Sequence, residues 1–394
     1  MLGWELPPNN SGGLGVACLQ LSKALAEAGA DIEFILPYEH SHDYGFMKVS
    51  AATNYPLDNL YALEAYQSYK YSSTSQHSYD THDQQLKYAY GVASLAERME
   101  FDIIHAHDWL TFRAALMVKQ KSNRPLVLHV HSIESDRAGG HGGNPIVREI
   151  EEQAMLIADH IFAVSERTRK LIISEYNITA DKVEVAHNSI DAAGWEPLEA
   201  TNAYKYLSEL KGQGWRVVAN VGRLTIQKGL PQLMEAAEKV TQNQPKTVFL
   251  IVGSGEQRDE LIELAASKGI ARNVLFTGFQ RGKRWRDAYA IADIFVMPSV
   301  SEPFGLTPFE AAGYGTPSLI SKQSGVSEVF ANCLKVDYWD TNLMADRIIG
   351  ALRSQAFLDE LGQNARQEFL SLSWNNTAAK ILGRYQLMSQ EASA

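Results

Sequence analysis

Cysteine is scarce in this chain, which has 394 residues and 2 cysteines, Cys18 and Cys333. Two cysteines cannot form a disulfide framework or a multi-cysteine metal site, and such a low content is typical of a reducing compartment. The sequence also lacks an apolar run of about 18–20 residues, the length that crosses a bilayer, and its first residues lack the basic region of a signal peptide. We therefore expect a cytoplasmic protein without membrane insertion.

Positive charge is scarce as well. The chain has 36 Lys and Arg against 46 Asp and Glu, which gives a formal net charge of −10. Sequence-independent binding to nucleic acids depends on an excess of positive charge, so we expect no nucleic-acid partner. A phosphate-bearing ligand must then be held by a few well-placed cations, and the positions of Arg and Lys are more informative than their number.

Short apolar runs rich in β-branched residues alternate along the chain with segments of helical periodicity. This alternation is typical of parallel α/β sheets that are covered by helices on both faces. Five runs precede a stretch without strand pattern and five follow it, which predicts two doubly wound, Rossmann-like domains. The runs are 32–36, 103–106, 126–130, 160–164 and 183–185 in the first half, and 217–221, 248–252, 274–276, 294–297 and 318–320 in the second.

The stretch without strand pattern covers residues 191–215 and sets the domain boundary near residue 200. We predict an N-terminal domain over 1–200 and a C-terminal domain over 201–373. The final segment, 374–394, is expected to be a helix that packs back on the N-terminal domain. Residues 54–90 hold 8 of the 17 Tyr, which fits either a surface loop and helix or an aromatic platform for a sugar polymer.

A glycine-rich stretch, N-S-G-G-L-G at residues 10–15, joins a very short opening strand to the first predicted helix. Glycines let backbone N–H groups approach an anion closely, and a helix N-terminus adds a favourable dipole. A plain tight turn and an anion-binding loop are both compatible with this pattern. A dinucleotide-binding loop is disfavoured, because the third glycine of G-x-G-x-x-G is missing.

Two predicted strands end in paired histidines, H-A-H-D-W at residues 105–109 and H-V-H at 129–131. Ligands of open α/β sheets bind at the carboxyl ends of strands, where both pairs lie. Alternating histidines can bind a metal, but no matching carboxylate or cysteine spacing accompanies them, so we predict no metal site. A glycine-rich stretch over 138–143 follows Arg137 and favours a mobile loop over a site.

The second half carries G-R-L-T-I-Q-K-G at residues 222–229, again at the end of a predicted strand. Arg223 and Lys228 on such a loop either converge on a diphosphate or are two solvated surface charges. The segment S-E-P-F-G-L-T-P-F-E over 301–310 follows the strand at 294–297.

Within that segment, Thr307-Pro308 predicts a helix start, with Thr307 as the N-cap and Pro308 at the first helical position. Glu310 then fits an ordinary capping box. Glu302 has no such structural reason, and its place in a Pro/Gly turn before a helix suits hydrogen bonding to sugar hydroxyls beside a phosphate held by backbone N–H groups.

Together these motifs resemble the retaining glycosyltransferases of family 4, most closely the glycogen/starch synthase-like branch. The specific part is E-x₇-E at 302–310 combined with R-x₄-K at 223–228, and H-N-S-I-D at 187–191 and S-G-V-S-E-V at 324–329 add to it. The resemblance covers nearly the whole chain. It implies the GT-B fold, in which two Rossmann-like domains face a central cleft. It also implies that the N-terminal domain, 1–200, lies on the acceptor side and that the C-terminal domain, 201–373, binds the nucleotide sugar.

The resemblance also assigns roles by position. It implies that Glu302 binds the hydroxyls of the transferred sugar and Glu310 the nucleotide ribose, and that His131 lies against the sugar near the reacting carbon. The catalytic candidates are His131, Arg223, Lys228 and Glu302. Donor binding is expected at Gly13, Gly222, Arg223, Lys228, Gly305, Leu306, Thr307 and Glu310, acceptor or sugar contacts at Asp108, Trp109 and Arg137, and a weaker contribution at Glu328.

The implied activity is transfer of a hexosyl group, most simply glucosyl, from a UDP- or ADP-linked donor to a sugar or oligosaccharide, with retention and without a metal or other cofactor. Ser11 stands where ADP-glucose-dependent glycogen synthases typically carry Lys in K-x-G-G-L, which weakens the ADP-glucose assignment. The alternatives are a sucrose- or sugar-phosphate-type synthase and a non-catalytic module that binds sugar nucleotides. The sequence does not specify the oligomeric state.

Overall fold

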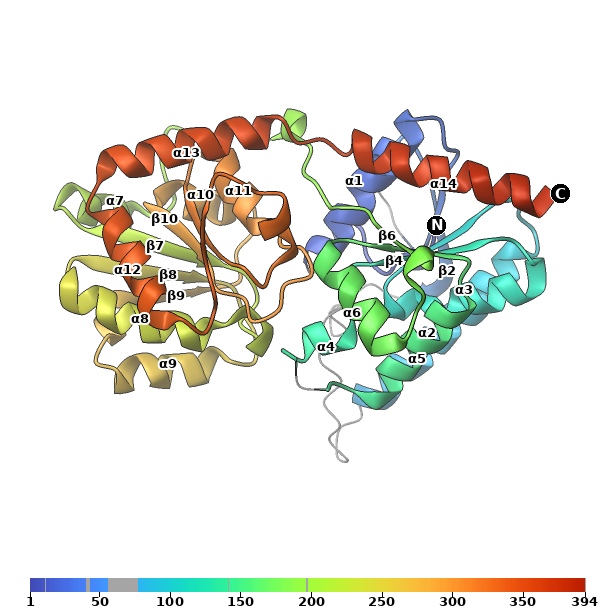
Figure 1. Ribbon diagram of the computed structural model, residues 1–394, viewed down its shortest axis with the longest axis horizontal. Coiled ribbons are helices and arrows are strands. Elements are labelled where there is room, and N and C mark those ends of the chain that lie inside the picture. Colours follow the sequence, from blue (N-terminus) through green and yellow to red (C-terminus); the bar gives the residue numbers. More distant parts are fainter. Residues whose placement is uncertain (11, 40–42, 56–76, 141, 196–197, 394) are drawn as a thin grey trace. The chain divides into compact units, whose positions relative to one another are not determined.

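The chain forms two compact α/β units in a computed structural model (Figure 1). Unit 1 contains Met1–Ser189 and Ser373–Ala394, and unit 2 contains Ile190–Leu372. Each unit is built on a parallel sheet with helices, which confirms the expected fold of two Rossmann-like domains. Much of the tyrosine-rich stretch falls outside the described residues, which are 1–10, 12–39, 43–55, 77–140, 142–195 and 198–393.

The sheet of unit 1 is held together by a very short N-terminal segment. Leu2 bridges Ile35 of one strand pair and Ala106 of a second group of strands, so it lies between β1 and β3. The backbone of Leu2 donates to the His105 carbonyl and accepts from the His107 N–H. The strands are β1 (Glu33–Tyr38), β2 (Lys48–Tyr55), β3 (Ile104–His107), β4 (Leu126–Val130), β5 (His160–Ala163) and β6 (Val183–Val185), in the orders β1-β2 and β3-β4-β5-β6.

The helices of unit 1 begin at residues suited to that position. The Ser165 side chain accepts a hydrogen bond from the Thr168 N–H at the start of α6, and Asn144 caps α5 ahead of Pro145. The last helix, α14, packs against α1, and its Ile381 is fully buried in the core of this unit. The helices are α1 (Gly13–Glu27), α2 (His77–Ala96), α3 (Trp109–Ser122), α4 (Glu134–Arg137), α5 (Pro145–Ile157), α6 (Glu166–Tyr176), η2 (Ala180–Lys182) and α14 (Asn375–Ser393).

The sheet of unit 2 has the strand order β12-β11-β10-β7-β8-β9. The chain builds β7, β8 and β9 outward in one direction and then returns to add β10, β11 and β12 on the other side of β7. The order therefore reverses between β7 and β10, and in open α/β sheets ligands bind at the carboxyl ends of the strands at such a reversal. The strands are β7 (Arg216–Val221), β8 (Thr247–Val252), β9 (Val274–Gly278), β10 (Ile294–Met297), β11 (Ser318–Ser321) and β12 (Leu334–Val336).

Helices lie on both sides of this sheet, with α8 and α9 on one side and α10 and α11 on the other (Figure 1). In the described parts of both units, no helix is sufficiently long and apolar to cross a membrane. The helices of unit 2 are η3 (Ala192–Gly194), α7 (Lys205–Gly212), η4 (Ile226–Lys228), α8 (Leu230–Asn243), α9 (Arg258–Ser267), η5 (Ala271–Asn273), α10 (Gly282–Ile291), α11 (Thr307–Gly313), η6 (Gly325–Glu328), α12 (Thr341–Leu352) and α13 (Gln355–Leu370).

Two strands were not expected from the sequence, β2 and β12, and both are the last strand at one end of a sheet. An edge strand is covered less completely than a central one, so it does not need a continuous apolar run. The β2 sequence, KVSAATNY, is half polar, and β12 has three residues. The expectation of five strands in each half was therefore too low.

Candidate functional site

Lys228 and Glu302 form an ion pair at the reversal of strand order in unit 2. Lys228 ends η4, in the segment that follows β7, and Glu302 lies in the segment that follows β10. The Lys228 Nζ is 2.5 Å from the Glu302 Oε2, and the Ser299 hydroxyl donates to the same oxygen at 3.1 Å. The exposed fractions of the Lys228 and Glu302 side chains are 21% and 9%, so the pair is largely withdrawn from solvent.

Gly229 allows the two loops that carry this pair to touch. Its φ is +65°, and a Cβ atom at this position would lie 2.1 Å from the carbonyl oxygen of Pro298. A side chain is therefore excluded both by the left-handed backbone and by the neighbouring loop. The loops are also joined by a hydrogen bond from the Val300 N–H to the Gln227 carbonyl at 2.9 Å.

The backbone of Glu302 is fixed by the segment that follows β11. Its N–H donates to the Gln323 carbonyl at 3.0 Å, and its carbonyl accepts from the Gly325 N–H at 2.9 Å. Glu328 lies on η6, the short helix that begins at Gly325. Three loops thus meet around Glu302, since the β7 loop supplies its cation and the β11 loop holds its backbone.

Gly305, Leu306 and Thr307 lie just beyond Glu302. Gly305 has a φ of +94°, and a Cβ atom there would lie 2.9 Å from the Glu302 Cγ. The expected N-cap at Thr307 is wrong: α11 begins at Thr307 after Leu306, no side chain caps it, and the Thr307 hydroxyl donates to the Met297 sulfur at 3.5 Å. The first N–H groups of a helix have no partner within it, so backbone donors remain at Leu306 and Thr307.

Glu310 is held by a neighbouring helix and not by the capping box that the sequence favours. The Tyr289 hydroxyl on α10 donates to the Glu310 Oε2 at 2.5 Å. Burial raises the pKa of the Glu310 carboxyl to about 7, even though the Tyr289 hydrogen bond lowers it. The carboxyl therefore changes charge near neutral pH.

Arg223 lies on a loop whose backbone is fixed on both sides. The Gly222 N–H donates to the Val252 carbonyl at 2.9 Å, and the Leu224 N–H donates to the Ser254 carbonyl at 2.8 Å. These bonds join the β7 loop to the β8 loop. Arg223, whose side chain is half-buried, lies between the two bonded residues in the sequence. Arg223 and Lys228 thus stand at the two ends of one short, restrained loop.

In unit 1, Asp108 links the carboxyl ends of β3 and β4. Its carboxylate accepts from the His131 N–H at 2.6 Å, the Ser132 N–H at 3.2 Å and the Ser132 hydroxyl at 3.3 Å. Its φ and ψ are 59° and 170°, a combination that favours glycine and is strained for an aspartate. Burial raises the pKa of the carboxyl to about 7, although Arg137 and the two N–H donors lower it.

Arg137 is an internal cross-link. It ends α4, and its guanidinium lies 3.0 Å from the Glu134 Oε2 and 2.5 Å from the Glu151 Oε1. It also donates to the Ser132 carbonyl and hydroxyl and lies 5.9 Å from the centre of the Trp109 ring. The Arg137 side chain is 4% exposed, so its contacts are those of a buried network and not of a residue on an exposed loop.

Gly13 begins α1 and is exposed. The Gly15 N–H, in the first turn of that helix, donates to the carboxylate of Glu5 at 3.2 Å, and Glu5 is 5% exposed. The Glu5 carboxylate thus accepts from one of the backbone N–H groups that were expected to be available to an anion. Gly13 itself lies two residues earlier, in the same turn.

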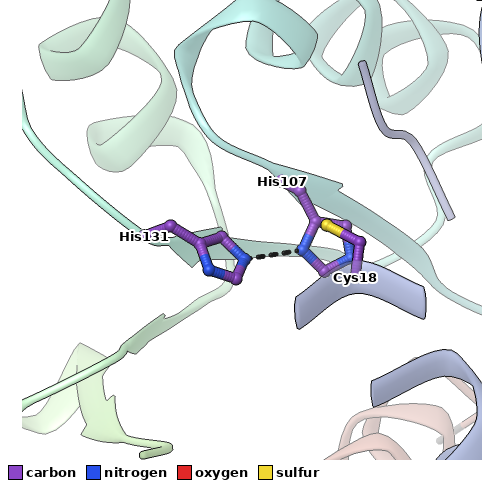
Figure 2. A group of neighbouring side chains, drawn as sticks. All are labelled: Cys18, His107 and His131. Carbon is purple, nitrogen blue, oxygen red and sulfur yellow. Dashed lines mark hydrogen bonds between the residues drawn. The ribbon is translucent and has the colours of Figure 1, made fainter. Parts of the chain in front are cut away.

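The histidines of β3 and β4 and His131, which follows β4, stack on one another. The ring centres of His105 and His107 are 4.7 Å apart, and those of His129 and His131 are 4.6 Å apart. The His107 Nδ1 and the His131 Nε2 are 3.1 Å apart and share a hydrogen bond (Figure 2). Burial lowers the pKa of all four rings, that of His129 to about 3, so His131 is neutral at physiological pH.

No pattern in the sequence points to two residues at these sites. Ser299 and Tyr289 come from segments outside the recognised motifs, and only the folded chain places them at their partners. Cys18 on α1 also lies beside His107 and His131, with one potential ligand atom from each within 4.8 Å of the others. No local spacing predicts this group, because its members come from three different elements.

Two family models match successive parts of the chain. The model described as Glycosyltransferase Family 4 matches residues 11–193, and the model described as Glycosyl transferases group 1 matches residues 208–368. A D-inositol 3-phosphate glycosyltransferase of Salinispora arenicola is 30% identical over 72% of this chain and 68% of its own length. The chain belongs to the glycosyltransferases.

Further glycosyltransferases are similar over more of the chain. An uncharacterised glycosyltransferase of Methanocaldococcus jannaschii is 27% identical over 98% of this chain and 97% of its own. A glycogen synthase of Mycobacterium tuberculosis is 27% identical over 84% of this chain and 80% of its own. The glycogen synthase-like relationship is thus one of several within this family of glycosyltransferases.

Solved glycosyltransferase structures share the fold. Sucrose-phosphate synthase from Thermosynechococcus elongatus superposes with a TM-score of 0.75 at 20% identity, over 97% of this chain and 94% of that one. The catalytic domain of starch synthase IV from Arabidopsis thaliana, bound to ADP and acarbose, gives a TM-score of 0.73 at 18% identity, over 99% and 98%. Identities this low show the fold alone.

Proposed function

We propose that this glycosyltransferase transfers a hexosyl group, in the simplest case glucosyl, from a UDP- or ADP-linked donor to a sugar or oligosaccharide, with retention of configuration. The observation that carries the proposal is the Lys228–Glu302 ion pair at the strand reversal of unit 2. A cation beside a carboxylate at this position suits a ligand that carries phosphate next to sugar hydroxyls.

Unit 2 supplies the groups that such a donor needs. Arg223 and Lys228 would neutralise the diphosphate together with the backbone N–H groups of Leu306 and Thr307, and each charge-assisted hydrogen bond contributes about 1.5–3 kcal/mol. Glu302 would accept hydroxyls of the sugar, and Glu310 in its ionised form would accept those of the ribose.

Unit 1 supplies a neutral imidazole and a restrained carboxylate. Burial keeps the pKa of His131 well below its ordinary value, so the ring would offer a hydrogen bond beside the reacting carbon without adding positive charge. Asp108 fixes the backbone of His131 and would thereby set the place of the ring.

In the proposed reaction the bond from the anomeric carbon to the diphosphate breaks, and the acceptor oxygen bonds to that carbon on the same face. Charge develops on the leaving diphosphate, so stabilisation of that charge and orientation of the acceptor would supply most of the rate enhancement. The two cations of the β7 loop would do this without a metal ion.

A small acceptor that carries phosphate is the second candidate. It is supported by the 30% identity to a protein named for D-inositol 3-phosphate and by the absence of lysine at Ser11. A neutral oligoglucan is supported by the matches to a glycogen synthase and to a starch synthase bound to acarbose.

The deciding experiment offers UDP-, ADP- and GDP-glucose with maltooligosaccharides, hexose phosphates or inositol 3-phosphate, with and without a chelator, and measures nucleotide release. We expect release from one donor that depends on one acceptor class and is insensitive to the chelator. The anomeric proton signal of the product reports retention. Failure of every donor, with Arg223→Ala indistinguishable from the wild type in donor binding, would overturn the proposal, and donor binding without turnover would show a non-catalytic module.

A further inference from the structure

Cys18, His107 and His131 bring a thiol and two imidazoles together in the core of unit 1 (Figure 2). Cys18 comes from α1, and the histidines come from the carboxyl ends of β3 and β4. One sulfur and two nitrogen atoms lie within 4.8 Å of one another. Their residues are 1%, 0% and 6% exposed, so His131 is the member nearest to solvent.

We propose that these three side chains bind a thiophilic divalent cation such as Zn²⁺, and that the bound cation withdraws His131 from the transfer reaction. Thiolate and imidazole are the ligands that Zn²⁺ prefers, and sites with three protein ligands leave a fourth position for water. At metal–ligand distances of about 2.0–2.3 Å, tetrahedral ligands lie roughly 3.3–3.8 Å apart. Side-chain movements of about 1 Å would therefore bring these three ligand atoms to the required spacing.

An unpartnered nitrogen gives independent support. The Nδ1 of His107 shares the hydrogen bond with His131, whereas its Nε2 is fully buried and has no hydrogen-bond partner among the described residues. A buried nitrogen without a partner is costly, and most such atoms in folded proteins are satisfied. The rings of His107 and His131 are neutral, so each keeps one N–H and has one nitrogen lone pair available to a cation.

The surrounding charges favour a cation. Burial raises the pKa of the Cys18 thiol, and the negative charges of Asp108 and Glu5 raise it further. The same carboxylates that disfavour a free thiolate stabilise a positive ion. Binding forms one metal–sulfur and two metal–nitrogen bonds, breaks the S–H bond of Cys18 and releases that proton to solvent, with no change of oxidation state.

Metal binding is tested first, on the full chain, by Co²⁺ titration followed by competition between Zn²⁺ and a chromophoric chelator. We expect one equivalent per chain and a thiolate-to-cobalt charge-transfer band. Cys18→Ala should lose the band and bind at least about 100-fold more weakly, since removal of groups that merely orient a ligand already costs 10–100-fold. Cys333→Ala is the matched control, because it removes the other cysteine, on unit 2, and should behave as the wild type.

Two further variants keep the test decisive. Cys18→Ser preserves the size of the buried side chain. We expect this variant to lose the band while the thermal unfolding temperature of the metal-free protein stays unchanged. That result would separate loss of a ligand from loss of the fold. His105→Gln addresses the deeper group of His105, His107 and His129. Absence of Co²⁺ binding, absence of the charge-transfer band, or binding that depends on His105 and not on Cys18 would overturn the proposal.

The inhibitory consequence rests on the proposed function and is measured separately. Zn²⁺ should inhibit nucleotide release by the wild type and by Cys333→Ala in proportion to site occupancy, each relative to its own metal-free rate, whereas Cys18→Ala should be insensitive at the same concentration. Inhibition that persists unchanged in Cys18→Ala would overturn this consequence. If no donor is turned over, the binding measurements still decide the cation site.

Discussion

The ammonium group of Lys228 lies 2.5 Å from a carboxylate oxygen of Glu302, although 74 residues separate them in the chain. The pair stands where the strand order of unit 2 reverses, and the Ser299 hydroxyl shares the same oxygen of Glu302. The cation and the carboxylate thus satisfy each other. A phosphate and a sugar bound as proposed would compete with this contact.

Lys228→Met should reduce both catalysis and stability. It removes a cation from the proposed diphosphate site, for which a loss of about 10²–10³-fold in kcat/KM is expected. It also leaves Glu302 largely buried without its ion-pair partner, which should lower the free energy of unfolding by about 1–3 kcal/mol, less than for a fully buried pair because Ser299 remains. Rates of nucleotide release and urea denaturation measure the two effects.

Lys322→Met is the control for that experiment. Lys322 forms an ion pair with Asp337 at 2.8 Å in the same unit, but its side chain is half-exposed. An ion pair that water reaches contributes little to stability, so this variant should change neither quantity appreciably. Equal losses of activity in both variants would contradict a specific role for Lys228.

Asp108→Asn should change how stability depends on pH. The pKa of Asp108 is raised from 3.8 to about 7, so the native state holds a proton that the unfolded chain releases between these values. The contribution is present below pH 4 and is lost as pH rises through 7. Between pH 4 and 7 the free energy of unfolding of the wild type should fall by roughly 2–4 kcal/mol relative to the variant, as urea denaturation at each pH would show.

Asp337→Asn supplies a control of opposite sign. Hydrogen bonds from Lys322 and Gln323 lower the pKa of the half-buried Asp337, so its contribution is present above pH 4 and is lost as the pH falls below that value. The wild type should therefore gain stability over this variant as the pH rises from 2 to 4, and change little above it. A slope of the same sign for both aspartates would refute the burial of Asp108.

The central strands could be predicted from the sequence, because a strand that is buried on both faces consists of a continuous apolar run. The strand β8 reads TVFLIV with every residue buried, and such a short apolar run is typical of a strand that is covered on both faces. The edge strand β2 carries Lys48, Ser50 and Thr53 and therefore has no continuous apolar run. The motifs at 222–229 and 301–310 were likewise placed correctly at strand ends, since chain order alone determines that position.

The partners of the site residues could not be predicted, because they come from other elements. Glu310 three residues after Thr307 fits a capping box by spacing, yet its carboxylate contacts Tyr289 on α10. Arg137 lies next to a glycine-rich stretch and was expected near the acceptor, yet Glu151 on α5 pairs with it. The spacing of residues along the sequence indicates which contacts are possible within one element, whereas tertiary packing determines which contacts form.

Arg137→Met distinguishes a buried cross-link from an acceptor contact. It leaves Glu134 and Glu151 without their shared cation in a dry environment, so the free energy of unfolding should fall by about 3–5 kcal/mol. Lys121→Met, which breaks the exposed pair with Glu97, should change stability little. A rise in KM for the acceptor with unchanged stability would instead support the role that the resemblance implies.

Gly229→Ala tests whether close contact between the β7 and β10 loops is required. A methyl group would lie 2.1 Å from the Pro298 carbonyl oxygen, and the φ of +65° strains any residue with a Cβ. Gly214→Ala is the matched control, because its φ is +84° but nothing lies within 4 Å of the added methyl. The control should lose about 1–2 kcal/mol of unfolding free energy from backbone strain alone. Gly229→Ala should lose clearly more unfolding free energy than the control. It should also lower kcat/KM for nucleotide release, because displacement of the loop would move Lys228 away from Glu302. Equal losses of unfolding free energy in the two variants would show that the loop contact contributes nothing.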